Sequence, residues 1–222
     1  MASSSARSYH HGNLRKAVLD LAHEVLEAEG REALSLRDLA RRLGVSHAAP
    51  AHHFVDRDGL LDALAARALS DLAALASSLP GGASSSGPDP GAFLVGFFRA
   101  FARYGAEQPR LVRLMIDRKD GDALKDLTAA TFSGPVAWLD AARRAGAVVD
   151  PVGVRAEEIL EVVLLGLLDV AARTGTSRRL DRVAGTTAEI VLAGLDGRAG
   201  HSDVAGPRRG RGAGRGGGGP VS

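Results

Sequence analysis

The sequence predicts an all-α protein with an N-terminal three-helix helix-turn-helix domain and a C-terminal helical domain. Apolar residues recur three and four positions apart along most of the chain, the spacing of one helix face, and no segment alternates convincingly like a strand. Hydrophobic residues make up 45% of the 222 residues but aromatic residues only 4%, a mix that favours a helical globule over a β-sandwich. A chain of this length can bury a substantial core.

The composition excludes several kinds of functional site and indicates where in the cell the protein acts. The chain has no cysteine, which excludes disulfides, thiolate catalysis and zinc-thiolate sites. Residues 1–12 lack an apolar leader, and the most apolar run, 159–172, contains Asp169 and is too short to span a bilayer. We therefore expect a cytoplasmic protein without membrane contact. The pI of 9.4 is weak evidence for DNA binding, since five arginines lie in residues 197–222.

Helical periodicity, together with residues typical of helix starts and ends, predicts nine helices. Asn13 and Asp56 are suitable N-caps, and Ser35 with Asp38 forms a start similar to a capping box. A Gly134-Pro135 pair is expected to kink or break one helix, and Asp150-Pro151 to open the next. The expected helices span 13–29, 36–43, 46–53, 57–79, 90–108, 109–116, 122–145, 151–173 and 178–195.

The segment from Leu36 to Ser46, LRDLARRLGVS, has the pattern of a helix-turn-helix. Ala40 is small enough for two helices to cross closely, Gly44 suits the sharp turn, and Val45 fills the crevice between helices. The following helix would then present its N-terminal residues to the edges of bases in a major groove. Other helical hairpins can share this pattern, but DNA binding is the favoured interpretation.

Residues 9–69 resemble the N-terminal domain of the TetR family of repressors. The match follows the family's order of helix, helix-turn-helix, phenylalanine and supporting helix, and continues more weakly through 91–116 and 158–172. The YHHGNLR opening and the SHAAP segment are similar to the subgroup with a WHG-type C-terminal domain. The chain departs from the family at Ala51, usually a phosphate-contacting tyrosine, and at 165–167, where Leu-Gly-Leu replaces the motif's Trp and His.

The resemblance implies five regions along the chain. These are a flexible arm (1–12), the helix-turn-helix domain (13–56), a connecting helix (57–79), an effector-binding and dimerisation domain (80–196), and a disordered Gly/Arg-rich tail (197–222).

The resemblance also implies a DNA-contacting surface made from the second, third and fourth helices. The residues expected to contact base edges are Ser46, His47 and Ala48. Those expected to contact phosphates or the flanking DNA backbone are Ser35, Arg37, His52, His53 and Arg57. Arg41 and Arg42 are interpreted as a solvated helix face. Pro50 removes one backbone bond early in the third helix, so we expect a slightly distorted first turn rather than a broken helix.

The C-terminal half is expected to hold an effector pocket and a dimer interface. A small, largely apolar effector would lie among Phe97, Phe101, Tyr104, Met115, Phe132 and Trp138, although simple core packing also explains most of these side chains. The helix over 151–173 is apolar on nearly every face. With the last helix it would form a four-helix bundle across a two-fold axis, through Leu164, Leu168, Ile190 and Val191.

These features predict a ligand-responsive repressor that binds a palindromic double-stranded DNA operator as a homodimer. Two alternatives stay open. Pro50 and Ala51 suggest a degenerate family member that acts as a protein-interaction module with weak DNA binding. An all-helical enzyme lacks support, because the sequence shows no phosphate-binding loop or nucleophile elbow. No cofactor or metal is expected: His10, His11, His52 and His53 lack an acidic partner at ligand spacing.

Overall fold

A computed structural model describes residues 11–79, 90–144, 146, 148 and 154–195. This part of the chain is helical and contains no strand, which confirms the predicted fold class. None of its helices is long and apolar enough to cross a membrane. The predicted tail and nearly all of the predicted N-terminal arm lie outside the described residues.

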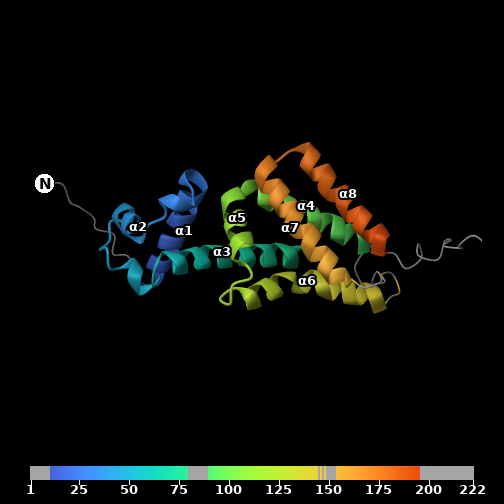
Figure 1. The fold of residues 1–222 in the computed structure, drawn as a ribbon, viewed down its shortest axis with the longest axis horizontal. Helices are drawn as coiled ribbons and strands as arrows, with labels where there is room; N and C mark the ends of the chain where they lie inside the picture. The colour runs from blue at the N-terminus through green and yellow to red at the C-terminus, as the bar shows by residue number, and fades with distance from the viewer. Residues whose placement is uncertain (1–10, 80–89, 145, 147, 149–153, 196–222) are drawn as a thin grey trace, which may run out of the picture.

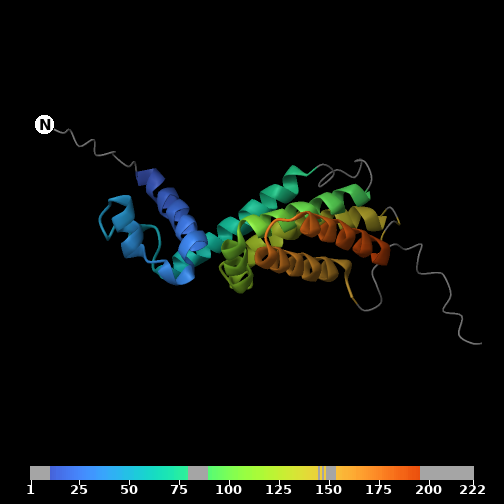
Figure 2. The same ribbon diagram turned by 90° about the horizontal axis from the view of Figure 1, so that it is seen from above.

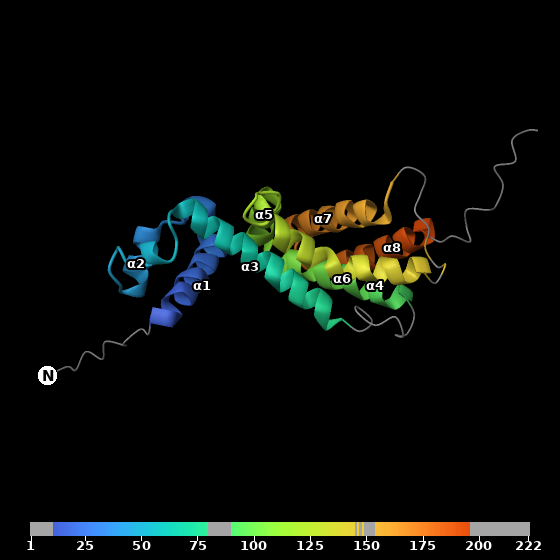
Figure 3. The same ribbon diagram turned by 90° about the horizontal axis from the view of Figure 1, so that it is seen from below.

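The helices form two groups joined by one long helix (Figures 1 and 3). The N-terminal group contains α1 (His11–Glu29), the 3₁₀ turn η1 (Arg31–Ala33), α2 (Leu36–Leu43) and the 3₁₀ turn η2 (Pro50–His52). The joining helix is α3 (Arg57–Ser78). The C-terminal group contains α4 (Pro90–Glu107), α5 (Pro109–Arg118), α6 (Lys125–Arg144), α7 (Ala156–Thr174) and α8 (Arg178–Leu195). Helix α3 runs from the N-terminal group along α5 and α6, while α4 packs against both α7 and α8.

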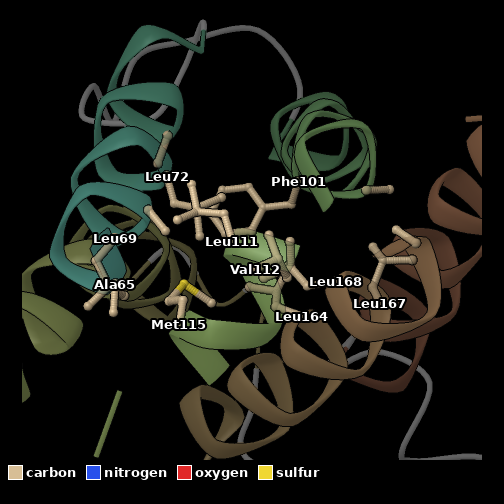
Figure 4. Close-up of a cluster of buried hydrophobic side chains, with 14 of the residues drawn as sticks. Ala65, Leu69, Leu72, Phe101, Leu111, Val112, Met115, Leu164, Leu167 and Leu168 are labelled. Carbon is tan, nitrogen blue, oxygen red and sulfur yellow. The ribbon is translucent and has the colours of Figure 1, made fainter. Parts of the chain in front are cut away.

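One continuous hydrophobic core runs through both groups. Figure 4 shows its centre, where side chains from α3, α4, α5 and α7 converge around Phe101, Leu111 and Leu168. Helices α4 and α7 cross there almost in backbone contact, because a Cβ added at Gly105 would lie 2.9 Å from the carbonyl oxygen of Leu168. A larger residue at Gly105 would have to push the two helices apart.

Two predicted helix starts are wrong. Helix α1 begins at His11, two residues before Asn13, so Asn13 lies inside the helix and is not its N-cap. Helix α7 begins at Ala156 rather than directly after Asp150-Pro151, because the backbone of Arg155 is extended and acts as the N-cap. The Glu158 carboxylate accepts a hydrogen bond of 3.2 Å from the Arg155 N–H, which fixes this later start.

The predicted kink or break at Gly134-Pro135 does not take the form of a break, because α6 continues through this pair as one helix. Proline removes a single backbone bond, the one that would reach the carbonyl of residue 131. Pro135, Trp138 and Leu139 are all buried on the inner face of α6, so core packing offsets that loss. The far end of α6 is fastened to α7 by Arg143, whose hydrogen bonds to Glu157 (2.7 and 2.8 Å) lower the pKa of that carboxyl to about 2.

Candidate nucleic-acid interface

Helix α2 has the predicted bounds but not the predicted capping box. Ser35 makes no side-chain capping bond, and the Asp38 carboxylate instead accepts hydrogen bonds from Arg41 and Arg42. The bonds from these guanidinium groups hold the pKa of Asp38 below its usual value. The helix ends as expected at Gly44, whose φ of 69° lies in the left-handed region and whose N–H bonds back to the carbonyls of Ala40 and Arg41.

The predicted third helix over 46–53 is absent as an α-helix. Residues 47–49 form turns, and Pro50–His52 form the 3₁₀ turn η2. The reason is Pro50: it has no N–H to donate to the carbonyl of Ser46, which instead accepts from the Ala49 N–H at 3.0 Å. The Ala51 and His52 N–H groups likewise bond three residues back, the 3₁₀ pattern. The expectation of a mere distortion therefore understated the effect of this proline.

The segment from Ser46 to His53 still presents a polar surface. Pro50 turns inward and is buried, as is Phe54 just after it, while Ser46, His47, Ala48, Ala51 and His52 are exposed and His53 is half-buried. The guanidinium carbon of Arg15, on α1, lies 5.4 Å from the centre of the Phe54 ring. The buried Pro50 ring and Phe54 phenyl group anchor this segment, which lies at the outer end of the N-terminal group (Figure 1).

The arginines of α2 differ in their partners. Arg41 is paired with Asp38, and Arg42 bridges Asp38 and Glu29, with its Nη1 lying 2.7 Å from the Glu29 carboxylate. Arg37 is exposed and has no hydrogen bond or ion pair with any residue that the structure describes. Its guanidinium is therefore available to an external anion, whereas the other two are neutralised within the chain.

Arg57 has a structural contact that sequence reasoning did not predict. Its Nε donates to the carbonyl of Leu34 (3.0 Å) and its Nη2 to the carbonyl of Arg31 (2.6 Å), which ties the start of α3 to η1. Three of its five N–H donors are left for a phosphate. The predicted cap next to it is confirmed, since the Asp56 carboxylate accepts from the Gly59 N–H at 2.8 Å.

Helix α1 is joined to α5 by hydrogen bonds that run in both directions, which we call the α1–α5 joint. The Glu27 carboxylate accepts from the backbone N–H groups of Arg110 (3.3 Å) and Leu111 (2.7 Å), at the start of α5. Arg110 Nη1 donates back to the carbonyls of Leu26 (3.3 Å) and Glu27 (2.8 Å). His23 Nε2 lies 2.7 Å from Gln108 Oε1 in the same joint. The joint fastens the N-terminal group to the α4–α5 corner.

We expect Glu27→Gln to weaken the α1–α5 joint. The substitution removes a negative charge beside the positive end of the α5 dipole and leaves one acceptor oxygen for two N–H groups. The free energy of unfolding should fall by about 1 kcal/mol in urea denaturation. Glu24→Gln, at an exposed position of the same helix, is the matched control and should change it by less than about 0.5 kcal/mol. Equal losses in both variants would mean that the contacts of Glu27 contribute nothing specific.

The six residues expected to line an effector pocket come from α4, α5 and α6. Phe97, Phe101 and Met115 are fully buried, Trp138 is nearly so, and Tyr104 and Phe132 are half-buried. The rings pack on one another, with 4.1 Å between the centroids of Phe97 and Phe101. The hydroxyl of Tyr104 donates to the Asp71 carboxylate at 3.2 Å, and burial raises the pKa of this tyrosine.

Two of the four residues expected at a dimer interface are wrong for that role. Leu164 and Leu168 are fully buried within the chain, beside Leu111 and Val112 (Figure 4), so neither can touch a second copy. Val191 is also mostly buried, while Ile190 is 66% exposed. The large apolar side chains exposed on the outer faces of α7 and α8 are Val162 (71%), Val170, Val183 and Ile190.

The N-terminal group matches a known protein family. Residues 18–64, from α1 into α3, match the model of the bacterial regulatory proteins of the tetR family. The chain therefore carries an N-terminal domain of the TetR type. Its N-terminal helical domain and all-helical C-terminal domain are the parts that the resemblance in the sequence implied. No match distinguishes the WHG-type subgroup, and a comparison with curated proteins gives no significant match.

Solved structures resemble this chain over most of its length. A Rhodococcus sp. RHA1 protein of unknown function is 29% identical, with a TM-score of 0.71, covering 86% of this chain and 99% of that one. A TetR-family regulatory protein from Rhodococcus RHA1 is 17% identical (TM-score 0.64; 82% and 96% covered). The TetR-family regulator PfmR from Thermus thermophilus is 24% identical (TM-score 0.59; 81% and 98% covered). The last two show a shared fold.

Proposed function

We propose that this protein is a TetR-family transcriptional repressor that binds a palindromic operator as a dimer and releases it when a small, largely apolar effector binds. The observation that carries the proposal is the outer surface of α2 and the segment after Gly44. There the side chains of Arg37, His47 and His52 are exposed and make no hydrogen bond or ion pair with the described residues, while Arg41 and Arg42 are neutralised by acids. Free cations and polar groups on a rigid, buried base are what a DNA-reading surface requires.

The roles of the DNA-contacting residues follow from their positions. Ser46, His47 and Ala48, in the turn that follows Gly44, would face the base edges in the major groove. The remaining residues would contact phosphates and fix the register: Ser35, Arg37, His52, His53 and, through its remaining donors, Arg57. Because η2 is a tight 3₁₀ turn rather than a helix of two turns, fewer side chains reach the groove, so we expect modest affinity.

The dimer interface is proposed on the outer faces of α7 and α8, which lie side by side in Figure 2. Val162 and Val170 are eight residues apart on α7, and Val183 and Ile190 are seven apart on α8, so each pair repeats along one helix face. Two copies meeting there would form a four-helix bundle. A two-fold axis through it implies operator half-sites about 34–36 Å apart, one turn of DNA.

We propose that the displacement caused by effector binding is transmitted along α4 to the α1–α5 joint, and that this releases the DNA. Helix α4 carries Phe97 and Phe101 and is followed by Gln108, which is hydrogen-bonded to His23 on α1. An effector that wedges between the aromatic rings would shift the end of α4, and α1 would move with it. The effector must bind the state without DNA more tightly than the DNA-bound state, since otherwise it changes no equilibrium.

The test is a mobility-shift assay with the upstream region of the protein's own gene, comparing Arg37→Ala with Arg41→Ala. Losing a phosphate contact at Arg37 should weaken binding about tenfold and reduce the dependence of log K on log salt by about 1. Arg41→Ala is the matched control and should change affinity less than about twofold, because Asp38 already neutralises that arginine. Equal losses for both would contradict the assignment of Arg37.

A protein-interaction module is the second candidate function. The observation that favours it is η2, which replaces the expected recognition helix and leaves Ala51 exposed. The same assay separates the two candidates: a module would show no preference for any sequence in the upstream region, and neither arginine variant would alter its retention.

A further inference from the structure

A hollow of about 780 Å³ lies between α4 and the beginning of α8. Four arginines line it in two pairs: Arg99 and Arg103 on α4, and Arg178 and Arg182 on α8. The members of each pair are four residues apart, so they lie one turn apart on one face of their helix. The sequence showed these spacings, but only the fold brings the two pairs to one hollow.

The hollow is strongly cationic. Asp181 is the one acidic residue among the described residues that line it, and its carboxylate lies 3.6 Å from Arg99 Nε. Arg103, Arg178 and Arg182 have no ion pair or hydrogen bond with any residue that the structure describes. All four arginines are exposed to solvent, which screens their mutual repulsion, and the three without partners are available to bind an anionic ligand.

The site also allows an arginine of α4 to lie close to the backbone of α8. Gly185, on α8, lies against the guanidinium of Arg99: a Cβ added there would be 3.0 Å from Arg99 Nη2 and 3.1 Å from Nε. The glycine therefore lets this arginine lie flat across α8. The floor of the hollow includes the apolar residues Ala102 and Leu180, which are almost wholly buried.

We propose that this hollow binds a small ligand with two adjacent phosphate groups, of the nucleoside diphosphate kind. A planar guanidinium forms two parallel hydrogen bonds with a phosphate, and two facing pairs of arginines provide this for two phosphates. The volume falls in the range of small-molecule sites. This ligand differs in chemistry from the apolar effector, and the site does not depend on DNA binding.

Isothermal titration calorimetry of the full chain with ADP and with inorganic pyrophosphate tests the proposal. We expect saturable binding of one ligand per chain, weaker binding of AMP, and at least a tenfold loss of affinity in Arg178→Ala or Arg103→Ala. Arg179→Ala, an exposed neighbour that does not line the hollow, is the matched control and should keep the affinity within twofold. Gly185→Ala should weaken binding severalfold by displacing Arg99, with circular dichroism checking that every variant is folded.

Three outcomes would overturn the proposal. These are no saturable binding of either probe, equal losses in Arg178→Ala and Arg179→Ala, and mutual displacement of ADP and duplex DNA of any sequence, which would make the hollow a contact for the DNA backbone. Loss of operator binding in Arg37→Ala with ADP binding intact would separate this site from the proposed repressor function.

Discussion

Replacing Val162 and Ile190 together by arginine is expected to convert the proposed dimer to a folded monomer. Both side chains are exposed, at 71% and 66%, on the adjoining outer faces of α7 and α8. In a dimer they would be buried against a second copy, where an unpaired guanidinium is strongly unfavourable. Sedimentation should give a mass near the 22.9 kDa of one chain. Operator affinity should fall by about a hundredfold or more, since each half-site is then bound independently.

The control for this pair adds the same charge elsewhere. Ala129→Arg with Ala137→Arg places two arginines at exposed positions of α6, away from the outer faces of α7 and α8 (Figure 1). This variant should keep the dimer and the operator affinity. If the Val162 and Ile190 variant still sediments as a dimer, the interface lies on another surface of the molecule.

Short-range signals predicted several features of the N-terminal group, but not the start of α1 or the cap of α2. The bounds of α2, its end at Gly44 and the cap of α3 by Asp56 follow from groups within four residues of one another, so the local sequence is sufficient. Pro50 shows why the third helix was not predicted correctly. Its missing N–H is evident in the sequence, but its ring is buried in the core, and periodicity does not reveal the tertiary packing of the resulting 3₁₀ turn.

Contacts between distant segments could not be predicted in this way. In the α1–α5 joint, Glu27 bonds to residues 83 and 84 positions away, and in the sequence it is only one of several glutamates on α1. The arginine hollow likewise depends on α4 and α8 meeting. The orientation of α7 was undetermined for a different reason: apolar residues cover nearly its whole circumference, so the pattern does not distinguish the buried face from the exposed one.

Leu164→Ala and Val162→Ala, two positions apart on α7, are expected to have very different effects. Leu164 is fully buried in the chain's own core, so its truncation leaves a cavity and should cost about 2–5 kcal/mol of unfolding free energy. For a chain of this size, each 1 kcal/mol lowers the melting temperature by about 2–4 °C. Val162→Ala truncates a side chain that is 71% exposed and replaces valine by a better helix former, so we expect little loss within one chain.

Thermal unfolding at several protein concentrations distinguishes a residue that packs within one chain from a residue that packs between two copies. The loss in Leu164→Ala should be the same at every concentration, because it arises within one chain. Any loss in Val162→Ala should appear only where dimers are populated and should vanish on dilution, since it acts through the association of two copies. A large, concentration-independent loss in Val162→Ala would instead place that side chain in the core of the monomer, and the dimer face would have to be sought on another helix.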